Sequence, residues 1–356
     1  MEKRAGSPGL MLVFTAFLLS LSSCGMGGGG TSGSSLPSTT FSAPSGATAT
    51  SFGKIAVDKS NNNVWIATNA GLMEIPAKTT SCSPASNCPT LSLGFTPAGI
   101  AVDGSGNVWV TNDSSSGSVT EISSSAISSG SCSSSCTNFS GFSNPTGIAV
   151  DGSGNVWVTN DSSSSGSVTE IPKGTSSTSC SSSCTKFSGS TYFSSPTGIA
   201  VDSNNNVWVT NDSSTGSVTE IKSGSSSCTK FSGFSSPVAV ATYSGSVWVA
   251  NSGSGGSYPP SIVAVSSSCS SSCPFIKGFT TPTGLAFDSG GNLWVIDSGN
   301  NTLVEITSAA IGSTSCTTST PCYNYSLPAK PQAIATDSNG NVWVTVTGAQ
   351  VIEYTP

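Results

Sequence analysis

The sequence of 356 residues contains no histidine and carries very little charge. Without histidine, the chain lacks the usual general base of enzymes and the commonest metal ligand. Only 8% of the residues are charged, and Arg4 is the single arginine. A chain with a net charge of −6 and so few cations offers no basic surface for phosphates. We therefore expect neither histidine-based catalysis nor a nucleic-acid partner.

The N-terminus has the features of an export signal. Lys3 and Arg4 precede an apolar stretch at residues 10–21, whose length is typical of a signal peptide and too short to cross a bilayer. The segment Leu21-Ser22-Ser23-Cys24 resembles the lipobox of bacterial lipoproteins, in which cleavage before the cysteine leaves its thiol to carry a lipid. This resemblance implies that Cys24 is the lipidation site. An ordinary signal peptide followed by an incidental cysteine is the alternative.

The chain divides into three parts on this interpretation. Residues 1–23 are the signal peptide, residues 24–38 are a tether rich in Gly and Ser, and residues 39–356 form one domain. Gly25 stands where the sorting rules of such lipoproteins require aspartate for retention in the inner membrane. The resemblance therefore favours the outer membrane or cell surface. We expect an exported, monomeric cell-envelope protein that the lipid attaches to the membrane.

All seven tryptophans stand in copies of one phrase. One copy is Gly-Ile-Ala-Val-Asp at residues 99–103, followed by Gly-Asn-Val-Trp-Val at residues 106–110. Successive tryptophans are 40 to 51 residues apart, which is the length of one four-stranded propeller blade. We therefore predict an all-β, seven-bladed β-propeller with four antiparallel strands in each blade. The tryptophans are Trp65, Trp109, Trp157, Trp208, Trp248, Trp294 and Trp343.

Alternating apolar residues and turn signals divide each repeat into strands. Around Trp109, strands are expected at residues 100–102, 108–111, 118–122 and 137–140. The last repeat supplies only three strands and ends with a strand at residues 351–354. Thr39-Thr40-Phe41-Ser42, near the predicted mature N-terminus, resembles the fourth-strand phrase Thr137-Asn138-Phe139-Ser140. We therefore predict that it completes the last blade and closes the ring.

These phrases resemble those of NHL-repeat propellers and, among them, the streptogramin-lyase-like (virginiamycin B lyase-like) family. The resemblance covers roughly residues 50–356. It implies the propeller fold, and in that family histidines, a glutamate and a magnesium ion open the antibiotic ring. No residue of this histidine-free chain can take over that set, so we assign no catalytic residue, metal or cofactor. A lactonase-like site of Asp, Glu and Asn around Ca²⁺ or Mg²⁺ is the alternative.

Polar residues that follow the second strand of several blades are the candidate ligand-binding residues. By analogy with known propellers, they lie near the axis on the same face as the turn before the first strand. Asn and Asp also cap their own turns by binding backbone amides, which is the alternative interpretation. The candidates are Asn112, Asp113, Asn160, Asp161, Asn211, Asp212, Asn251 and Asp297, with Asn69 as a looser equivalent.

Three other recurring residue types are given structural interpretations. Aspartates in the hairpin after the first strand are explained by Asx turns, with Thr242 interrupting the set. Glutamates of the third strand are expected to be solvated or paired with the neighbouring blade. The tryptophans stand between apolar neighbours and are expected between blades rather than stacked on sugars. The carboxylates are Asp103, Asp151, Asp202, Asp288 and Asp337, and Glu74, Glu121, Glu170, Glu220, Glu305 and Glu353.

Ten of the twelve cysteines form close pairs between the third and fourth strands. An exported protein can keep them oxidised, and each small loop would contribute about 2 kcal/mol of stability. The pairs are Cys82 with Cys88, Cys132 with Cys136, Cys180 with Cys184, Cys269 with Cys273, and Cys316 with Cys322. Cys228 is left over in a shortened loop, and we expect a free or intermolecular thiol there.

We expect a non-enzymatic scaffold that binds a ligand or protein through its polar Asn- and Asp-rich face. A divergent enzyme of the lyase or lactonase class is the alternative. A glycan ligand would require aromatic side chains outside the core, for which Tyr243, Tyr258 and Phe275 are the candidates.

Overall fold

The computed structural model describes residues 36–44, 49–124, 126, 132, 136–161, 166–176, 178–266, 273–312 and 322–356. The predicted signal peptide, Cys24 and most of the predicted tether lie outside these residues. All of these described residues belong to one compact unit. No helix in the described part of the chain is long and apolar enough to cross a membrane.

Seven antiparallel sheets of four strands each make up the domain, and we call them blades 1 to 7. Blade 1 has β2 (Phe52–Asp58), β3 (Asn63–Thr68), β4 (Gly71–Ile75) and β5 (Thr90–Ser92). Blade 2 has β6 (Pro97–Val102), β7 (Val108–Asn112), β8 (Gly117–Ile122) and β9 (Cys136–Phe142). Blade 3 has β10 (Pro145–Val150), β11 (Val156–Asn160), β12 (Ser167–Ile171) and β13 (Thr185–Ser188). Blade 4 has β14 (Pro196–Val201), β15 (Val207–Asn211), β16 (Ser217–Ile221) and β17 (Cys228–Ser232).

The remaining three blades repeat the arrangement. Blade 5 has β18 (Pro237–Tyr243), β19 (Ser246–Asn251), β20 (Ser261–Val265) and β21 (Phe275–Lys277). Blade 6 has β22 (Pro282–Phe287), β23 (Leu293–Asp297), β24 (Thr302–Ile306) and β25 (Cys322–Ser326). Blade 7 has β26 (Pro331–Thr336), β27 (Val342–Val346), β28 (Gln350–Tyr354) and β1 (Ser38–Ser42). In the described part of the chain, the short helices η1 (Ala85–Asn87) and α2 (Cys180–Ser183) lie between third and fourth strands.

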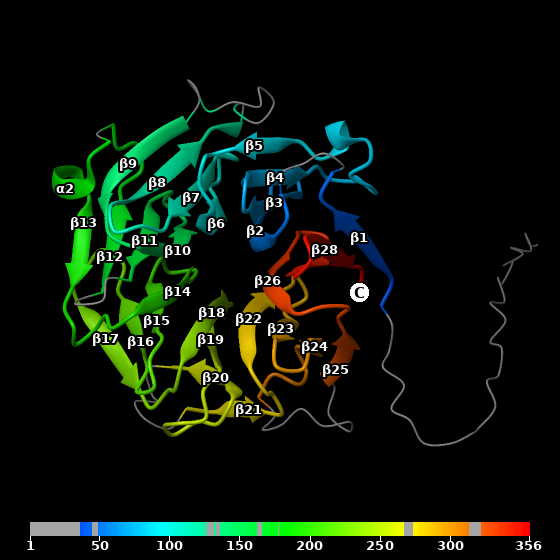
Figure 1. Ribbon diagram of the computed structural model, residues 1–356. Coiled ribbons are helices and arrows are strands. Elements are labelled where there is room, and N and C mark those ends of the chain that lie inside the picture. Colours follow the sequence, from blue (N-terminus) through cyan, green and yellow to red (C-terminus); the bar gives the residue numbers. More distant parts are fainter. Residues whose placement is uncertain are drawn as a thin grey trace, which may run out of the picture. The chain divides into compact units, whose positions relative to one another are not determined.

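The blades form a closed ring (Figure 1). Each first strand contacts the first strand of the next blade, from β2 through β26, and β26 contacts β2. The predicted seven-bladed, all-β propeller is therefore confirmed. The predicted closure is also confirmed, because β1 pairs antiparallel with β28 and places Phe41 opposite Val351. The buried Phe41 ring lies 5.5 Å from Trp343, so the N-terminal strand adds core as well as hydrogen bonds.

The second strand of each blade is buried on both faces because neighbouring blades cover it. In β7, for example, Val108, Trp109 and Val110 are all buried. Trp109 belongs to a cluster with Ile148, Val156 and other residues of blade 3. Such double coverage explains the continuous apolar runs around the tryptophans. The tryptophans therefore form the core between blades, as predicted.

Three of the five predicted cysteine pairs are disulfides in the described residues: Cys82–Cys88, Cys132–Cys136 and Cys180–Cys184. Cys273 and Cys322 are also disulfide-bonded. Their predicted partners, Cys269 and Cys316, lie outside the described residues. Cys228 is a free cysteine, and burial raises the pKa of its half-buried thiol.

Candidate functional site

The hairpin aspartates do more than close Asx turns. In blade 3, Asp151 Oδ1 accepts the backbone N–H groups of Ser153 and Asn155, each at 2.9 Å. Its Oδ2 accepts Asn155 Nδ2 at 2.9 Å and the indole Nε1 of Trp157 at 3.0 Å. Burial acts to raise the pKa of Asp151, but these hydrogen bonds outweigh it and lower the pKa. The carboxylate therefore stays ionised and fixes the tryptophan that packs against the next blade.

Five blades form this Asp–Asn–Trp network, and in all five the aspartate precedes the tryptophan by six residues. Their tryptophans are Trp109, Trp157, Trp208, Trp294 and Trp343. Asp58 and Trp65 of blade 1 are seven residues apart, and Trp65 Nε1 is buried without a partner. In blade 5, Thr242 was expected to stand in place of the hairpin aspartate, and the strand pairing corrects this. Thr242 pairs with Val247 and so occupies the position of the last valine of the first strand, and the shorter hairpin has no residue at the aspartate position.

The third-strand glutamates bond within their own blade, which corrects the expected pairing with the neighbouring blade. Asn341 Nδ2 donates both to Asp337 Oδ2 at 2.9 Å and to Glu353 Oε1 at 3.1 Å. Glu305 accepts the hydroxyl of Tyr325 in the adjacent strand at 3.0 Å. Burial, followed by the charge of Asp337, raises the pKa of Glu353. These carboxylates therefore belong to the packing of each blade.

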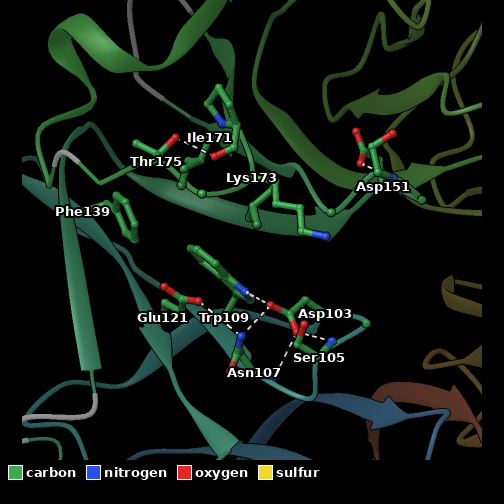
Figure 2. A pocket seen from close by; sticks show the side chains of 17 residues that line it. Asp103, Ser105, Asn107, Trp109, Glu121, Phe139, Asp151, Ile171, Lys173 and Thr175 are labelled. Atoms are coloured by element: carbon green, nitrogen blue, oxygen red, sulfur yellow. Dashed lines mark hydrogen bonds between the residues drawn. The ribbon is translucent and has the colours of Figure 1, made fainter.

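A groove between blades 2 and 3 brings carboxylates and a lysine together (Figure 2). Its volume is about 500 Å³, and Asp103, Glu121, Asp151 and Lys173 line it together with Trp109. Both aspartates are fully engaged in their Asp–Asn–Trp networks. Burial, then the charge of Asp103, raises the pKa of Glu121, whose Oε1 accepts Asn107 Nδ2 at 3.3 Å. The groove is thus a by-product of the repeated network.

Three of the eight predicted ligand residues at the ends of the second strands accept hydrogen bonds from the backbone of a nearby turn. Asn211, Asn251 and Asp297 are at most 1% exposed. Asn211 Oδ1 accepts Ser194 N, and Asn251 Oδ1 accepts Ser235 N. Asp297 accepts the backbone N–H groups of both Thr280 and Thr281, and the exposed Asn69 likewise accepts those of Thr50 and Ser51. Each acceptor holds the turn that leads into the first strand of its blade, as the capping interpretation predicts.

Blade 3 departs from this pattern at the equivalent asparagine. Asn160 is 4% exposed, and its Nδ2 donates to Thr169 Oγ1 at 3.0 Å, whereas its Oδ1 has no hydrogen-bond partner. The equivalent Asn112 of blade 2 is half-buried. Neither side chain lines the groove between blades 2 and 3.

Three of the candidate aspartates lie on the face of the ring where the second strands end. We call Asp113, Asp161 and Asp212 the acidic arc. Asp113 is exposed, and the other two are half-buried. Burial raises the pKa of Asp161, a hydrogen bond from Ser195 lowers it, and the charges of Asp113 and Asp212 raise it again. The three carboxylates are therefore close enough to interact. They come from blades 2, 3 and 4 and give this sector of the face a negative charge.

An axial channel of about 400 Å³ lies where the seven first strands meet. Hydroxyl groups tie its walls together: Thr111 Oγ1 donates to Thr146 O of the next blade at 2.9 Å, and Thr345 Oγ1 donates to Gly53 O at 2.7 Å. A Cβ on Gly99 would lie 2.2 Å from Thr146 O, so the close approach of blades 2 and 3 requires glycine there. None of the described residues that line the channel carries a carboxylate.

Sequence reasoning missed Lys54, which lines this channel as its single charged residue among those described. Aligning Ile55-Ala56-Val57 with Ile100-Ala101-Val102 would have revealed it, because Lys54 falls where every other repeat has glycine or alanine. Its side chain remains accessible to solvent, yet burial by the surrounding walls lowers its pKa. The seven equivalent residues are Lys54, Gly99, Gly147, Gly198, Ala239, Gly284 and Ala333.

Only one of the three candidate aromatic side chains for a glycan is exposed. Tyr258 is 2% exposed, and Phe275 is half-buried beside it at 5.4 Å. Tyr243 is 37% exposed and stacks on Phe287 at 5.1 Å. It lines a cavity of about 430 Å³ with Lys59. This cavity lies by the hairpins that follow the first strands, on the opposite face from the acidic arc.

Comparisons with known proteins agree with this architecture. The NHL repeat model matches residues 193–220 and 279–306, and no curated protein sequence matches the chain. A streptogramin B lyase structure is 13% identical, with 89% of this chain and 97% of that chain covered and a TM-score of 0.68. Virginiamycin B lyase from Staphylococcus aureus is 15% identical, with 90% and 100% covered and a TM-score of 0.67. The WD40 propeller domain of Doa1 is 10% identical, with 86% and 93% covered and a TM-score of 0.66. The chain therefore carries NHL repeats on a fold that it shares with these proteins.

Proposed function

We propose that this protein is an exported propeller, attached to the membrane by a lipid on Cys24, that binds a ligand or protein partner and catalyses no reaction. The observation that carries this proposal is the rigid construction of the face that bears the acidic arc. Buried acceptors such as Asn211, Asn251 and Asp297 hold its turns in place. A preformed surface of this kind binds a partner at little cost in conformational entropy.

The proposed binding face combines two features. The channel mouth offers a concave, mainly uncharged cavity, and the acidic arc offers a negatively charged border. Small-molecule sites in proteins are typically concave and lined by apolar groups with few polar ones. We place the protein at the outer membrane or cell surface as a monomer, where this face would meet a small molecule, a glycan or another protein.

Metabolic labelling tests the lipid anchor. Cells that express the full chain are grown with an alkyne analogue of palmitate, and incorporation into the purified protein is measured. We expect label in the wild-type protein and in Cys228→Ala, which retains Cys24, and none in Cys24→Ala. Label that persists in Cys24→Ala, or an unlabelled wild-type protein, would contradict the anchor.

The second candidate is a divergent lyase or lactonase with an oxygen-ligated divalent cation, and the lyase-like fold is the observation that favours it. Among the described residues, no group of three or more Asp, Glu or Cys side chains is placed to hold a metal ion. Calorimetric titration with CaCl₂ and MgCl₂ separates the candidates. We expect no binding up to millimolar concentrations. Micromolar binding that Asp161→Asn abolishes would favour the enzyme and refute the scaffold.

A further inference from the structure

The axial channel brings one lysine into a ring of small residues. Six of the seven equivalent positions are glycine or alanine, and Lys54 is the one long side chain among them that lines the channel. Since the blades are copies of one repeat, the exception is local to blade 1. Every other blade has a small residue at this position, and its first and second strands pair in the same way as those of blade 1.

The ammonium group of Lys54 has no acidic partner in the described part of the chain. The aspartates of the acidic arc follow second strands, and the hairpin aspartates lie at the other ends of the first strands. Burial by the channel walls lowers the pKa of Lys54, and no neighbouring carboxylate contributes to that shift. The exposed ammonium group of Lys54 is therefore the one positive charge on the described channel wall, with no carboxylate beside it. An anion that enters the channel would supply the missing counter-charge.

The remaining channel wall limits the kind of anion. The hydroxyl groups of Thr146 and Thr197 are engaged with Thr159 and Thr210 of their own blades at 2.9 and 3.2 Å. The rest of the wall consists mainly of glycine, alanine and aliphatic residues such as Ile148 and Leu285. Gln332 and the buried hydroxyl of Thr283, which has no hydrogen-bond partner, are its further polar groups. One cation matches one negative charge, and an aliphatic wall matches an apolar body. A volume of about 400 Å³ lies within the range of pockets for small organic ligands.

We propose that the axial channel binds an organic monocarboxylate, whose carboxylate pairs with the Lys54 ammonium and whose apolar body lies against the first strands. The inference rests on the proposed binding function and names the class of small molecule that this face would accept. The acidic arc and the net charge of −6 would repel anions at long range. At physiological ionic strength this repulsion is screened beyond about 8 Å, whereas contact with Lys54 is not.

Calorimetric titration with three probes of equal length tests the proposal: hexanoate, hexanamide and hexylammonium, in 150 mM NaCl. We expect the wild-type protein to bind hexanoate at least tenfold more tightly than hexanamide and to bind hexylammonium no better than hexanamide. Lys54→Gln should bind hexanoate and hexanamide equally, while Lys54→Arg should retain the preference. Lys173→Gln is the matched control, because it removes a lysine from the groove between blades 2 and 3 and should leave the preference unchanged.

Three results would overturn the proposal: no binding of hexanoate, equal binding of hexanoate and hexanamide by the wild-type protein, or a preference that survives in Lys54→Gln. Thermal unfolding of each variant verifies that it is folded. Failure of the channel proposal is distinguishable from failure of the proposed function. Loss of the carboxylate preference removes the channel ligand but leaves a protein-binding face, whereas micromolar binding of Ca²⁺ or Mg²⁺ refutes the scaffold whichever carboxylate result is obtained.

Discussion

Blades 3 and 5 have the same four strands but build their first hairpin in different ways. In blade 3, Val150 pairs with Val156 and encloses five residues, among them Asp151 and Asn155. In blade 5, Thr242 pairs with Val247 and encloses four. The shorter loop turns at Ser244 and Gly245 with φ values of 49° and 78°, which is typical of a two-residue hairpin turn.

This difference decides what the buried tryptophan contacts. Trp157 donates its indole N–H to Asp151, whereas in blade 5 no described carboxylate accepts that of Trp248. Both tryptophans are nevertheless 5 to 6% exposed and pack against the next blade. The apolar pattern is therefore sufficient to build a blade. The Asp–Asn–Trp network adds stability to the hairpin on top of that pattern.

The largest expected effect is on the pH dependence of stability, because the pKa of the network aspartate is lowered in three blades. In the folded state, burial acts to raise the pKa of Asp103, Asp151 and Asp202, but their hydrogen bonds outweigh it and lower the pKa. The stability that these carboxylates contribute is therefore fully present above the unfolded pKa of about 3.9, and it is lost as the pH falls through the lowered folded pKa values. The third-strand glutamates have the opposite sign. Burial raises the pKa of Glu121 and Glu353, so acidification from pH 7 towards about 4.3 adds stability.

As the pH is lowered, the temperature midpoint of unfolding should therefore rise slightly from pH 7 to pH 5 and then fall steeply below about pH 4. Circular dichroism melts from pH 2.5 to pH 7 measure this profile. A midpoint that stays constant between pH 5 and pH 3 would contradict the role of the aspartates.

Asp151→Ala is the next largest perturbation. It removes four hydrogen bonds and leaves the donors of Asn155 and Trp157 without a buried acceptor, so we expect a loss of about 2 to 4 kcal/mol in the free energy of unfolding. Urea unfolding measures it. Ser246→Ala alters the corresponding hairpin of blade 5, where the side chain is exposed, and serves as control with an expected loss below about 0.5 kcal/mol. Equal losses of unfolding free energy in the two variants would contradict the conclusion that the network stabilises the hairpin of blade 3.

Replacing the buried tryptophan of blades 3 and 5 by phenylalanine separates the contribution of the hydrogen bond from that of packing. Trp157→Phe loses indole packing and the bond to Asp151, whereas Trp248→Phe loses packing alone. We expect Trp157→Phe to be the more destabilising by about 1 kcal/mol, the typical net value of one hydrogen bond. The difference between the two urea midpoints is the quantity to compare. A larger loss of unfolding free energy in Trp248→Phe than in Trp157→Phe would contradict a stabilising role of the hydrogen bond to Asp151.

The smallest effect is expected at the turn of blade 5. Ser244 has a φ of 49°, in the left-handed region that glycine adopts without penalty. Ser244→Gly should therefore raise the free energy of unfolding by about 0.5 kcal/mol. Ser153→Gly in the blade 3 hairpin, where φ is not positive, is the control and should not stabilise. If Ser153→Gly also raised the free energy of unfolding, the gain in Ser244→Gly could not be ascribed to the left-handed backbone of the blade 5 turn.

Much of the fold was predictable because repetition exposes it. The tryptophan spacing indicated seven blades, and the likeness of Phe41 to Phe139 indicated the closing strand. The Asp–Asn–Trp network was also present in the sequence as a constant six-residue separation from Asp to Trp, but an Asx turn alone accounts for an aspartate such as Asp151 at that position. The direction of Asn211 and Asn251 was not predictable, because the same residue type at a strand end caps a turn or faces a ligand depending on the neighbouring backbone.

The sequence by itself determined the seven blades, the closing strand and the positions of the cysteine pairs, because alternation, turns and repeats are local properties of the chain. Only the tertiary structure decided which side chains meet at the axis. Lys54 and Gly284 are 230 residues apart in sequence (284 − 54) and line one channel only because the ring closes. The tertiary structure likewise turned the oxygens of the buried Asn211 and Asn251 towards backbone amides, since a buried carboxamide requires partners and the adjacent turns supply them.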